Sequence, residues 1–248
     1  MNNQFIHRRT KLAENLQSGI AVIPTAKEVV RNKDAHFPYR FDSYFHYLTG
    51  FGEPESVIVI IGGKTPSSIL FCRGKNKEKE IWNGFRHGPE AAKNLLHCDE
   101  AYSIDEIDQI LPQLIENKDT IYTPLGIDVS WDQQIMGWLN QTRSRVREGI
   151  AAPEGLIDVR GMLDEMRLFK DPSELDTMRQ AAKISAEAHV LAMTATKPGK
   201  YEYAIEAEFL YHFKKNGSQF PAYTSIVAGG KNACVLHYIE NNAVLNDG

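Results

Sequence analysis

Two short apolar runs limit what this chain can fold into more than any other feature. Residues 57–61 and 69–72 are rich in β-branched side chains, and a Gly-Gly-Lys-Thr-Pro segment that favours a turn lies between them. Each run has the length of a strand and is far too short to cross a bilayer. The sequence therefore predicts two paired strands and no membrane segment.

Helical patterns alternate with further strand patterns in the front part of the chain. Strands are predicted at residues 20–23 and 120–123, and helices at 4–18, 104–114 and 130–139. Ser103 and Glu106 have the spacing of a capping box before the second of these helices. Strands and helices mixed at this spacing predict an α/β layer domain.

The pattern changes near Lys170. Asp171, Pro172 and Glu174 form a strong helix start, because they supply a capping carboxylate, a proline in the first turn and an acid three residues after the cap. A second helix is predicted at about 201–215, and a strand at 224–228. We therefore expect one domain over residues 1–170 and another over 171–248. The packed face of the first of these helices is predicted to carry Leu175, Met178, Ala182, Ser185, His189 and Met193.

Charge, cysteine content and missing motifs exclude several classes of protein. The net charge of -4 gives no reason to expect nucleic-acid binding. Three widely spaced cysteines form no disulfide framework, and the polar N-terminus lacks the apolar core of a signal peptide, so we expect a cytoplasmic protein. There is no His-Glu-x-x-His and no Gly-x-Ser-x-Gly motif. Gly62-Gly63-Lys64-Thr65 looks like the end of a phosphate-binding loop, but Ile58 stands where that motif needs glycine.

Four segments are similar to one known family. They are Phe-Pro-Tyr-Arg at 37–40 with the run at 43–55, Glu-Ile-Trp-Asn-Gly at 80–84, Asp-Glu-Met-Arg-Leu-Phe-Lys at 164–170, and the run at 220–238 that ends in Cys-Val-Leu-His-Tyr. In this order the chain resembles bacterial aminopeptidase P (Xaa-Pro aminopeptidase) over essentially its whole length. The third and fourth segments also occur, more loosely, in prolidases and creatinases.

The resemblance implies both a fold and an activity. The fold would be α/β: a mixed-sheet N-terminal domain flanked by helices, then the truncated start of an α+β pita-bread domain. The activity would be that of a proline-specific metalloaminopeptidase, which releases the N-terminal residue of Xaa-Pro peptides through hydroxide activated by two Mn²⁺ or similar ions. The family's metal ligands follow a turn like Asn246-Asp247-Gly248, so none is assigned in this chain. We expect this chain alone to be inactive and to bind no metal.

Two site residues follow from the resemblance. His237 matches a histidine beside the scissile bond that stabilises developing charge, and Trp82 matches a tryptophan that caps the substrate pocket from a neighbouring subunit. The expected partners are therefore a peptide with proline in second position and further copies of this chain. By the residues alone, His237 follows the apolar run 234–236 and would lie at the mouth of a buried strand, where a purely structural histidine is the alternative. Trp82 alone could equally be a core or interface residue.

Two other functions stay open at this point. One is a non-catalytic module for oligomerisation or substrate gating, and the other is a related prolidase-type or creatinase-type hydrolase.

Overall fold

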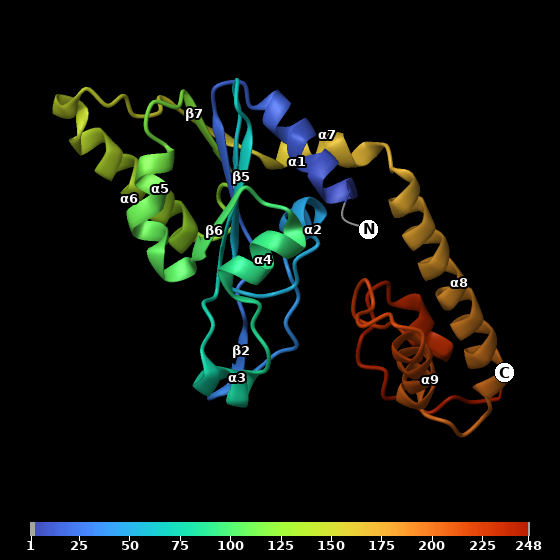
Figure 1. The fold of residues 1–248 in the computed structure, drawn as a ribbon. Helices are drawn as coiled ribbons and strands as arrows, with labels where there is room; N and C mark the ends of the chain where they lie inside the picture. Colours follow the sequence, from blue (N-terminus) through green and yellow to red (C-terminus); the bar gives the residue numbers. More distant parts are fainter. Residues whose placement is uncertain (1–2, 248) are drawn as a thin grey trace. The chain divides into compact units, whose positions relative to one another are not determined.

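A computed structural model describes residues 3–247 of this chain (Figure 1). Its contacts group the chain into two compact units, Met1–Phe169 and Lys170–Gly248. Each unit is described by itself.

The first unit is a mixed sheet with helices on both faces. Its strands are β1 (Ile20–Pro24), β4 (Val57–Ile61), β5 (Ser67–Cys72), β6 (Glu100–Ser103), β7 (Thr120–Thr123) and β8 (Gly155–Asp158), with a small separate hairpin of β2 (Val30–Asn32) and β3 (Ala35–His36). Its helices are α1 (Asn3–Asn15), α2 (Ser43–Thr49), α3 (Lys77–Asn83), α4 (Gly88–Leu96), α5 (Ile107–Leu114), α6 (Val129–Ser144) and α7 (Arg160–Leu168), with short 3₁₀ turns η1 (Ile104–Glu106) and η2 (Val146–Glu148).

The sheet has the strand order β6-β5-β4-β1-β7-β8. Strands β1, β4 and β5 pair antiparallel, whereas β6, β7 and β8 each pair parallel to a neighbour. The predicted strand pair is confirmed, because Val57 lies opposite Phe71 and Ile61 opposite Ser67. The α/β mixed-sheet fold class is confirmed as well.

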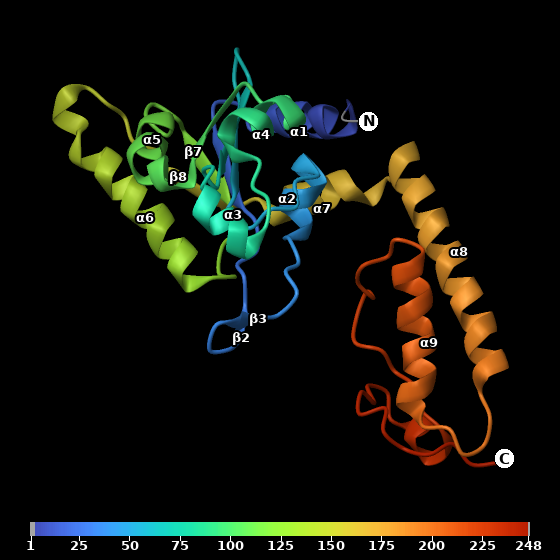
Figure 2. The ribbon, with the colours of Figure 1, turned by 60° about the horizontal axis from the view of Figure 1, so that its bottom comes forward.

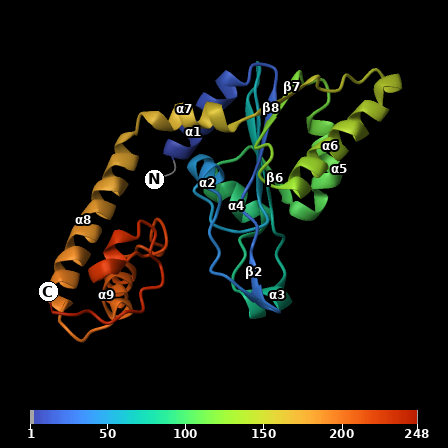
Figure 3. The same cartoon turned by 180° about the vertical axis from the view of Figure 1, so that it is seen from behind.

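Both faces of the sheet are buried, which explains why its strands read as continuous apolar runs. Successive side chains of a strand point to opposite faces. Ile58 and Ile60 accordingly pack with helices α1, α2, α4 and α7, whereas Val57 and Val59 pack with α5 and α6. Figure 3 shows α5 and α6 on the face opposite α1 and α2.

The second unit contains helices α8 (Pro172–Ala195) and α9 (Glu202–Lys215) and a short 3₁₀ helix η3 (Gly230–Cys234). The two long helices lie side by side (Figure 2). The predicted start of α8 is confirmed, since the Asp171 carboxylate accepts a hydrogen bond from the Glu174 N–H at 3.0 Å and the Glu174 carboxylate accepts one from the Asp171 N–H at 2.9 Å.

The predicted packed face of α8 is wrong by about one residue. Its buried positions are Ile184, Ala188 and Ala192. Met178 and Met193, on the predicted face, are exposed. These positions are four residues apart on one face of the helix, and the small side chains of Ala188 and Ala192 let α9 approach closely.

The strand predicted at 224–228 does not form; this segment is irregular. A strand needs a neighbour to receive its backbone groups, and within the described part of this unit a side chain takes that place. The Asn241 amide accepts from the Val227 N–H and donates to the Ser225 carbonyl, both at 2.9 Å.

Within residues 3–247, no helix has the combined length and hydrophobicity needed to span a membrane.

Candidate functional site

His237 lies in an exposed, irregular segment after η3. Leu236 before it is 89% exposed and Val235 is exposed too. The expectation that this apolar run is a buried strand is therefore wrong, because no sheet forms at 224–228 to receive it. Within the described residues the His237 imidazole has no hydrogen-bond partner, so both ring nitrogens are available to an incoming group.

The neighbouring residue, Tyr238, fixes this segment to the body of the unit. Tyr238 is buried, and its hydroxyl donates to the Glu202 carboxylate at 2.7 Å. Glu202 is the first residue of α9 and is fully buried. His237 is thus an exposed side chain beside a buried anchor.

Glu202 receives four hydrogen bonds, two at each carboxylate oxygen. Oε1 accepts from the Gly229 N–H at 2.8 Å and from the Asn232 amide at 3.3 Å, and Oε2 accepts from the Tyr238 hydroxyl and from the Ala243 N–H at 3.0 Å. The Glu202 N–H in turn donates to the Ala243 carbonyl at 2.9 Å. One carboxylate therefore connects the start of α9 to both sides of His237.

These bonds decide the ionisation of Glu202. Burial alone raises the pKa of a carboxyl group, but the donors from Gly229, Tyr238, Ala243 and Asn232 outweigh it and lower the pKa of Glu202 to about 2. The pKa of Tyr238 is raised, chiefly because its hydroxyl donates a hydrogen bond to the Glu202 carboxylate. Glu202 is therefore ionised at neutral pH and acts as a fixed acceptor.

Asn241 completes the support of the His237 segment. It is buried, and besides its bonds to residues 225 and 227 its amide donates to the Glu206 carboxylate at 3.1 Å. Its backbone has a φ of 47°, a left-handed value that asparagine tolerates better than most residues.

The sequence did not reveal Glu202 or Asn241. Glu202 stands in the first turn of a helix, where an acid ordinarily complements the helix dipole. Its partners lie 27 to 41 residues further along the chain. No local pattern marks such distant contacts.

Trp82 lies on α3, a short helix without any buried residue. It is 85% exposed, and Ile81 and Phe85 beside it are exposed as well. The alternative that Trp82 belongs to the core is therefore excluded for this chain. We name these three exposed side chains, Ile81, Trp82 and Phe85, the Trp82 patch.

The two predicted site residues belong to different units, Trp82 to the first and His237 to the second. Neither lies in a set of metal ligands. Within residues 3–247 no group of three or more His, Cys, Asp or Glu side chains could hold a metal ion. The described residues thus do not by themselves fit the metal centre that the resemblance implies.

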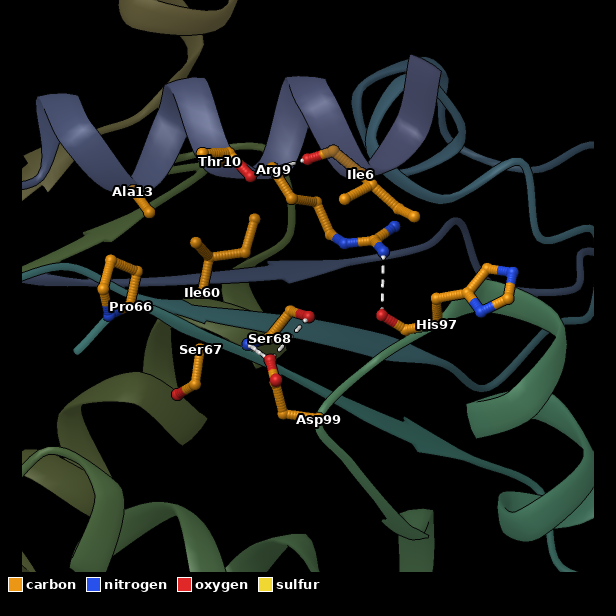
Figure 4. Close-up of a pocket in the computed structure, with 10 residues that line it drawn as sticks. All are labelled: Ile6, Arg9, Thr10, Ala13, Ile60, Pro66, Ser67, Ser68, His97 and Asp99. Carbon is orange, nitrogen blue, oxygen red and sulfur yellow. Dashed lines mark hydrogen bonds between the residues drawn. The ribbon is translucent and has the colours of Figure 1, made fainter. Parts of the chain in front are cut away.

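A cavity of about 210 Å³ lies between α1 and the sheet of the first unit (Figure 4). The polar side chains of Arg9, Ser68 and Asp99 in its lining already have partners. Arg9 donates to the carbonyls of Leu48 and Leu96, and Asp99 accepts from the Ser68 N–H at 2.7 Å. These bonds join α1, α2 and α4 to the sheet, which is a structural role.

Comparison with known proteins identifies both units. Residues 5–122 match the family described as "Aminopeptidase P, N-terminal domain", and residues 176–248 match "Metallopeptidase family M24". The chain is 40% identical to Xaa-Pro aminopeptidase of Escherichia coli over 99% of its own length and 56% of that protein. It is 39% identical to Xaa-Pro aminopeptidase of Haemophilus influenzae, over 99% of this chain and 55% of that protein.

Solved structures give the same result. The low-pH form of aminopeptidase P from E. coli matches with a TM-score of 0.97 at 39% identity, covering 100% of this chain and 57% of that one. Aminopeptidase PepP of Pseudomonas aeruginosa matches with a TM-score of 0.97 at 42% identity, over 100% of this chain and 57% of that one. The chain thus spans little more than half the length of the relatives it matches.

Proposed function

The chain belongs to the aminopeptidase P family, and on this premise we propose that the protein, at the full length of its relatives, removes the N-terminal residue from peptides with proline in second position. One observation carries the proposal: the identity of 39–40% to two Xaa-Pro aminopeptidases extends over 99% of this chain. It therefore includes both the His237 segment and the Trp82 patch. The alternatives of a non-catalytic module or a prolidase-type enzyme have no comparable support.

We propose that residues 1–170 form an N-terminal domain and that residues 171–248 form the first part of a pita-bread metallopeptidase domain. The metal ions, two Mn²⁺ or similar divalent ions, would be held by further residues of that domain. When bound, such ions activate the water that attacks a peptide carbonyl. The 248 residues alone would then not hydrolyse peptides.

The part of His237 is to donate a hydrogen bond to the carbonyl oxygen of the scissile bond. The hydrogen bond stabilises the reaction most strongly when negative charge develops on that oxygen. The site needs the imidazole held in place yet open to the peptide. Support comes from its exposure on a segment that Glu202 and Asn241 fix on both sides.

Trp82 would contact either the peptide or a second copy of the chain in a homo-oligomer. Large exposed aromatic side chains that cluster on a surface are typical of binding sites. A cytoplasmic location is proposed from the cysteines, since Cys72, Cys98 and Cys234 are all free thiols.

The test uses the full-length protein supplied with Mn²⁺. We expect it to release the first residue from an Ala-Pro-Ala tripeptide, to leave Ala-Ala-Ala intact, and to lose activity when a chelator removes the metal. Cleavage of the Ala-Pro dipeptide alone would indicate a prolidase. Absence of cleavage of all three peptides would refute the proposed function.

A further inference from the structure

The Trp82 patch lies on a loop that leaves the first unit after β5 and returns before α4. The loop runs from residue 75 to residue 86 and contains helix α3. None of the seven residues of α3 is buried, and within residues 3–247 the exposed Trp82 indole has no hydrogen-bond or ring partner. A helix of this length is not stable by itself in water. Contacts elsewhere in the loop must therefore hold Trp82 in place.

Glu80 is the residue of α3 that faces the body of the first unit. Its side chain is 20% exposed, whereas the other residues of the helix are all exposed. Glu80 and Trp82 are two positions apart, and each position turns an α-helix by about 100°, so the two side chains project to nearly opposite sides. A contact that fixes Glu80 against the unit therefore also sets the direction in which Trp82 projects.

One carboxylate oxygen of Glu80 joins the two ends of the loop. Its Oε1 atom accepts a hydrogen bond from the Arg86 backbone N–H at 2.8 Å and another from the Lys75 ammonium group at 3.0 Å. Lys75 begins the loop and Arg86 ends it. The bond from the Arg86 N–H, followed by that from Lys75, lowers the pKa of Glu80, so this carboxylate is charged at neutral pH.

The end of the loop at Arg86 is attached to the buried part of the unit. Arg86 itself is buried, and the next residue, His87, donates its backbone N–H to the Glu53 carboxylate at 2.8 Å. Glu53 is buried as well, and its other oxygen accepts from Arg73, directly after β5, at 3.4 Å. A side chain is held precisely when the groups that support it are themselves fixed. Glu80 meets this condition through Arg86.

The other polar contacts of the loop are local. The Asn76 side chain caps α3 by accepting from the Lys79 N–H at 2.9 Å, and the Lys75 ammonium group lies 3.9 Å from the centre of the Phe85 ring. Both contacts join exposed residues of the loop to one another. Among the hydrogen bonds and ion pairs of the α3 side chains in the described part of the chain, only those of Glu80 reach the buried end of the loop.

We propose that Glu80 is a positioning residue, whose carboxylate fixes the orientation from which Trp82 makes its binding contact. The inference rests on the proposed function for the existence of that contact, whereas the geometry that supports it lies within the first unit alone. In this role Glu80 acts only through Trp82. Its loss should therefore disturb Trp82, and it should have no effect on activity once Trp82 has been removed.

The first measurement follows Trp82 directly by fluorine NMR. The full-length protein is labelled with fluorotryptophan, and the Trp82 signal is the one that Trp82→Phe removes. We expect Glu80→Ala to narrow this signal and to shift it towards that of free fluorotryptophan. The signals of Trp131 and Trp138, which are buried in the core, should stay in place.

Two control variants separate the role of the carboxylate from a general effect on α3. Glu78→Ala makes the same change at an exposed position of the helix and should leave the Trp82 signal as in the wild type. Glu80→Gln retains a side-chain oxygen that can accept from the Arg86 N–H, so it should restore most of the wild-type signal.

The second measurement is a double-mutant cycle on cleavage of the Ala-Pro-Ala tripeptide by the full-length, metal-supplied enzyme. Glu80→Ala and Trp82→Ala should each lower kcat/KM about 10-fold, the usual effect of truncating an aromatic side chain that anchors a contact. The double variant should be no slower than Trp82→Ala, because Glu80 then has nothing to position. A role of Glu80 in the fold alone would give losses that multiply.

Several outcomes would overturn the inference. An unchanged Trp82 signal in Glu80→Ala would do so whether or not the enzyme is active, and so would losses of kcat/KM that multiply in the double variant. Movement of the Trp131 and Trp138 signals in Glu80→Ala would assign Glu80 to the fold of the unit. If the wild-type enzyme cleaved no peptide while the Trp82 signal moved as expected, the proposed function would fail and the positioning role would stand.

Discussion

Glu202 is a single carboxylate whose four donors come from the segment around His237. Its pKa is about 2 in the folded protein against an ordinary value of 4.5, so between these values the folded state binds fewer protons than the unfolded state. Its stabilising contribution is therefore complete above about pH 4.5 and is lost as the pH falls towards about 2.

We predict that protection of the Gly229 and Ala243 amides from hydrogen exchange falls as the pH is lowered from about 4.5 towards about 2 in the wild-type protein. In Glu202→Gln these two backbone amides should have low protection already at pH 7. The glutamine side chain has one acceptor oxygen, so it cannot accept from both amides. Glu208→Gln, a change on the same helix outside this network, should behave as the wild type. Protection of these amides at about pH 2 equal to that at pH 7 in the wild type would contradict the assignment.

His237 is predicted to act on the reaction and not on the fold. In the full-length enzyme His237→Ala should lower kcat about 100-fold to 1000-fold, the usual effect of losing one donor to a developing oxyanion. Metal content and melting temperature should be unchanged, because the imidazole is exposed and bonds to no described residue. Turnover at the wild-type rate would exclude this role.

At the scale of elements, the start of α8 shows how local chemistry fixes a helix boundary. Asp171→Ala removes the cap of α8 and should lower the free energy of unfolding by about 0.5–2 kcal/mol in urea titrations followed by circular dichroism. Asp176→Ala removes only an exposed pair with Arg179 and should cost far less. Equal losses in both variants would show that the capping box does not stabilise this helix.

Elements with local signals could be predicted from the sequence. The apolar runs of β1, β4, β5 and β7 and the capping residues Ser103 and Asp171 all correspond to structure found at those places. The strand at 224–228 could not be judged in this way, because its formation depends on a neighbour and Asn241 takes that place. Likewise, the burial and ionisation of Glu202 could not be predicted, because its partners lie 27 to 41 residues further along the chain.

At the scale of the whole molecule, the two apolar cores of the sheet consist entirely of residues from the first unit. We therefore predict that residues 1–169, expressed alone, unfold in one cooperative urea transition. Trp131 and Trp138 are buried in that unit, with their rings 5.7 Å apart, and report on it by fluorescence. Trp82→Phe removes the signal of the exposed tryptophan. A broad transition without a native baseline would show that this unit requires the rest of the chain.

The position of β1 near the middle of the sheet has a consequence for synthesis on the ribosome. β1 ends at Pro24, yet its parallel neighbour β7 begins only at Thr120. At about 5–20 residues per second, roughly 100 residues take about 5–20 s to be made. During that interval the nascent chain carries an apolar strand with an open edge, which is the kind of segment that chaperones bind before the sheet can close around it.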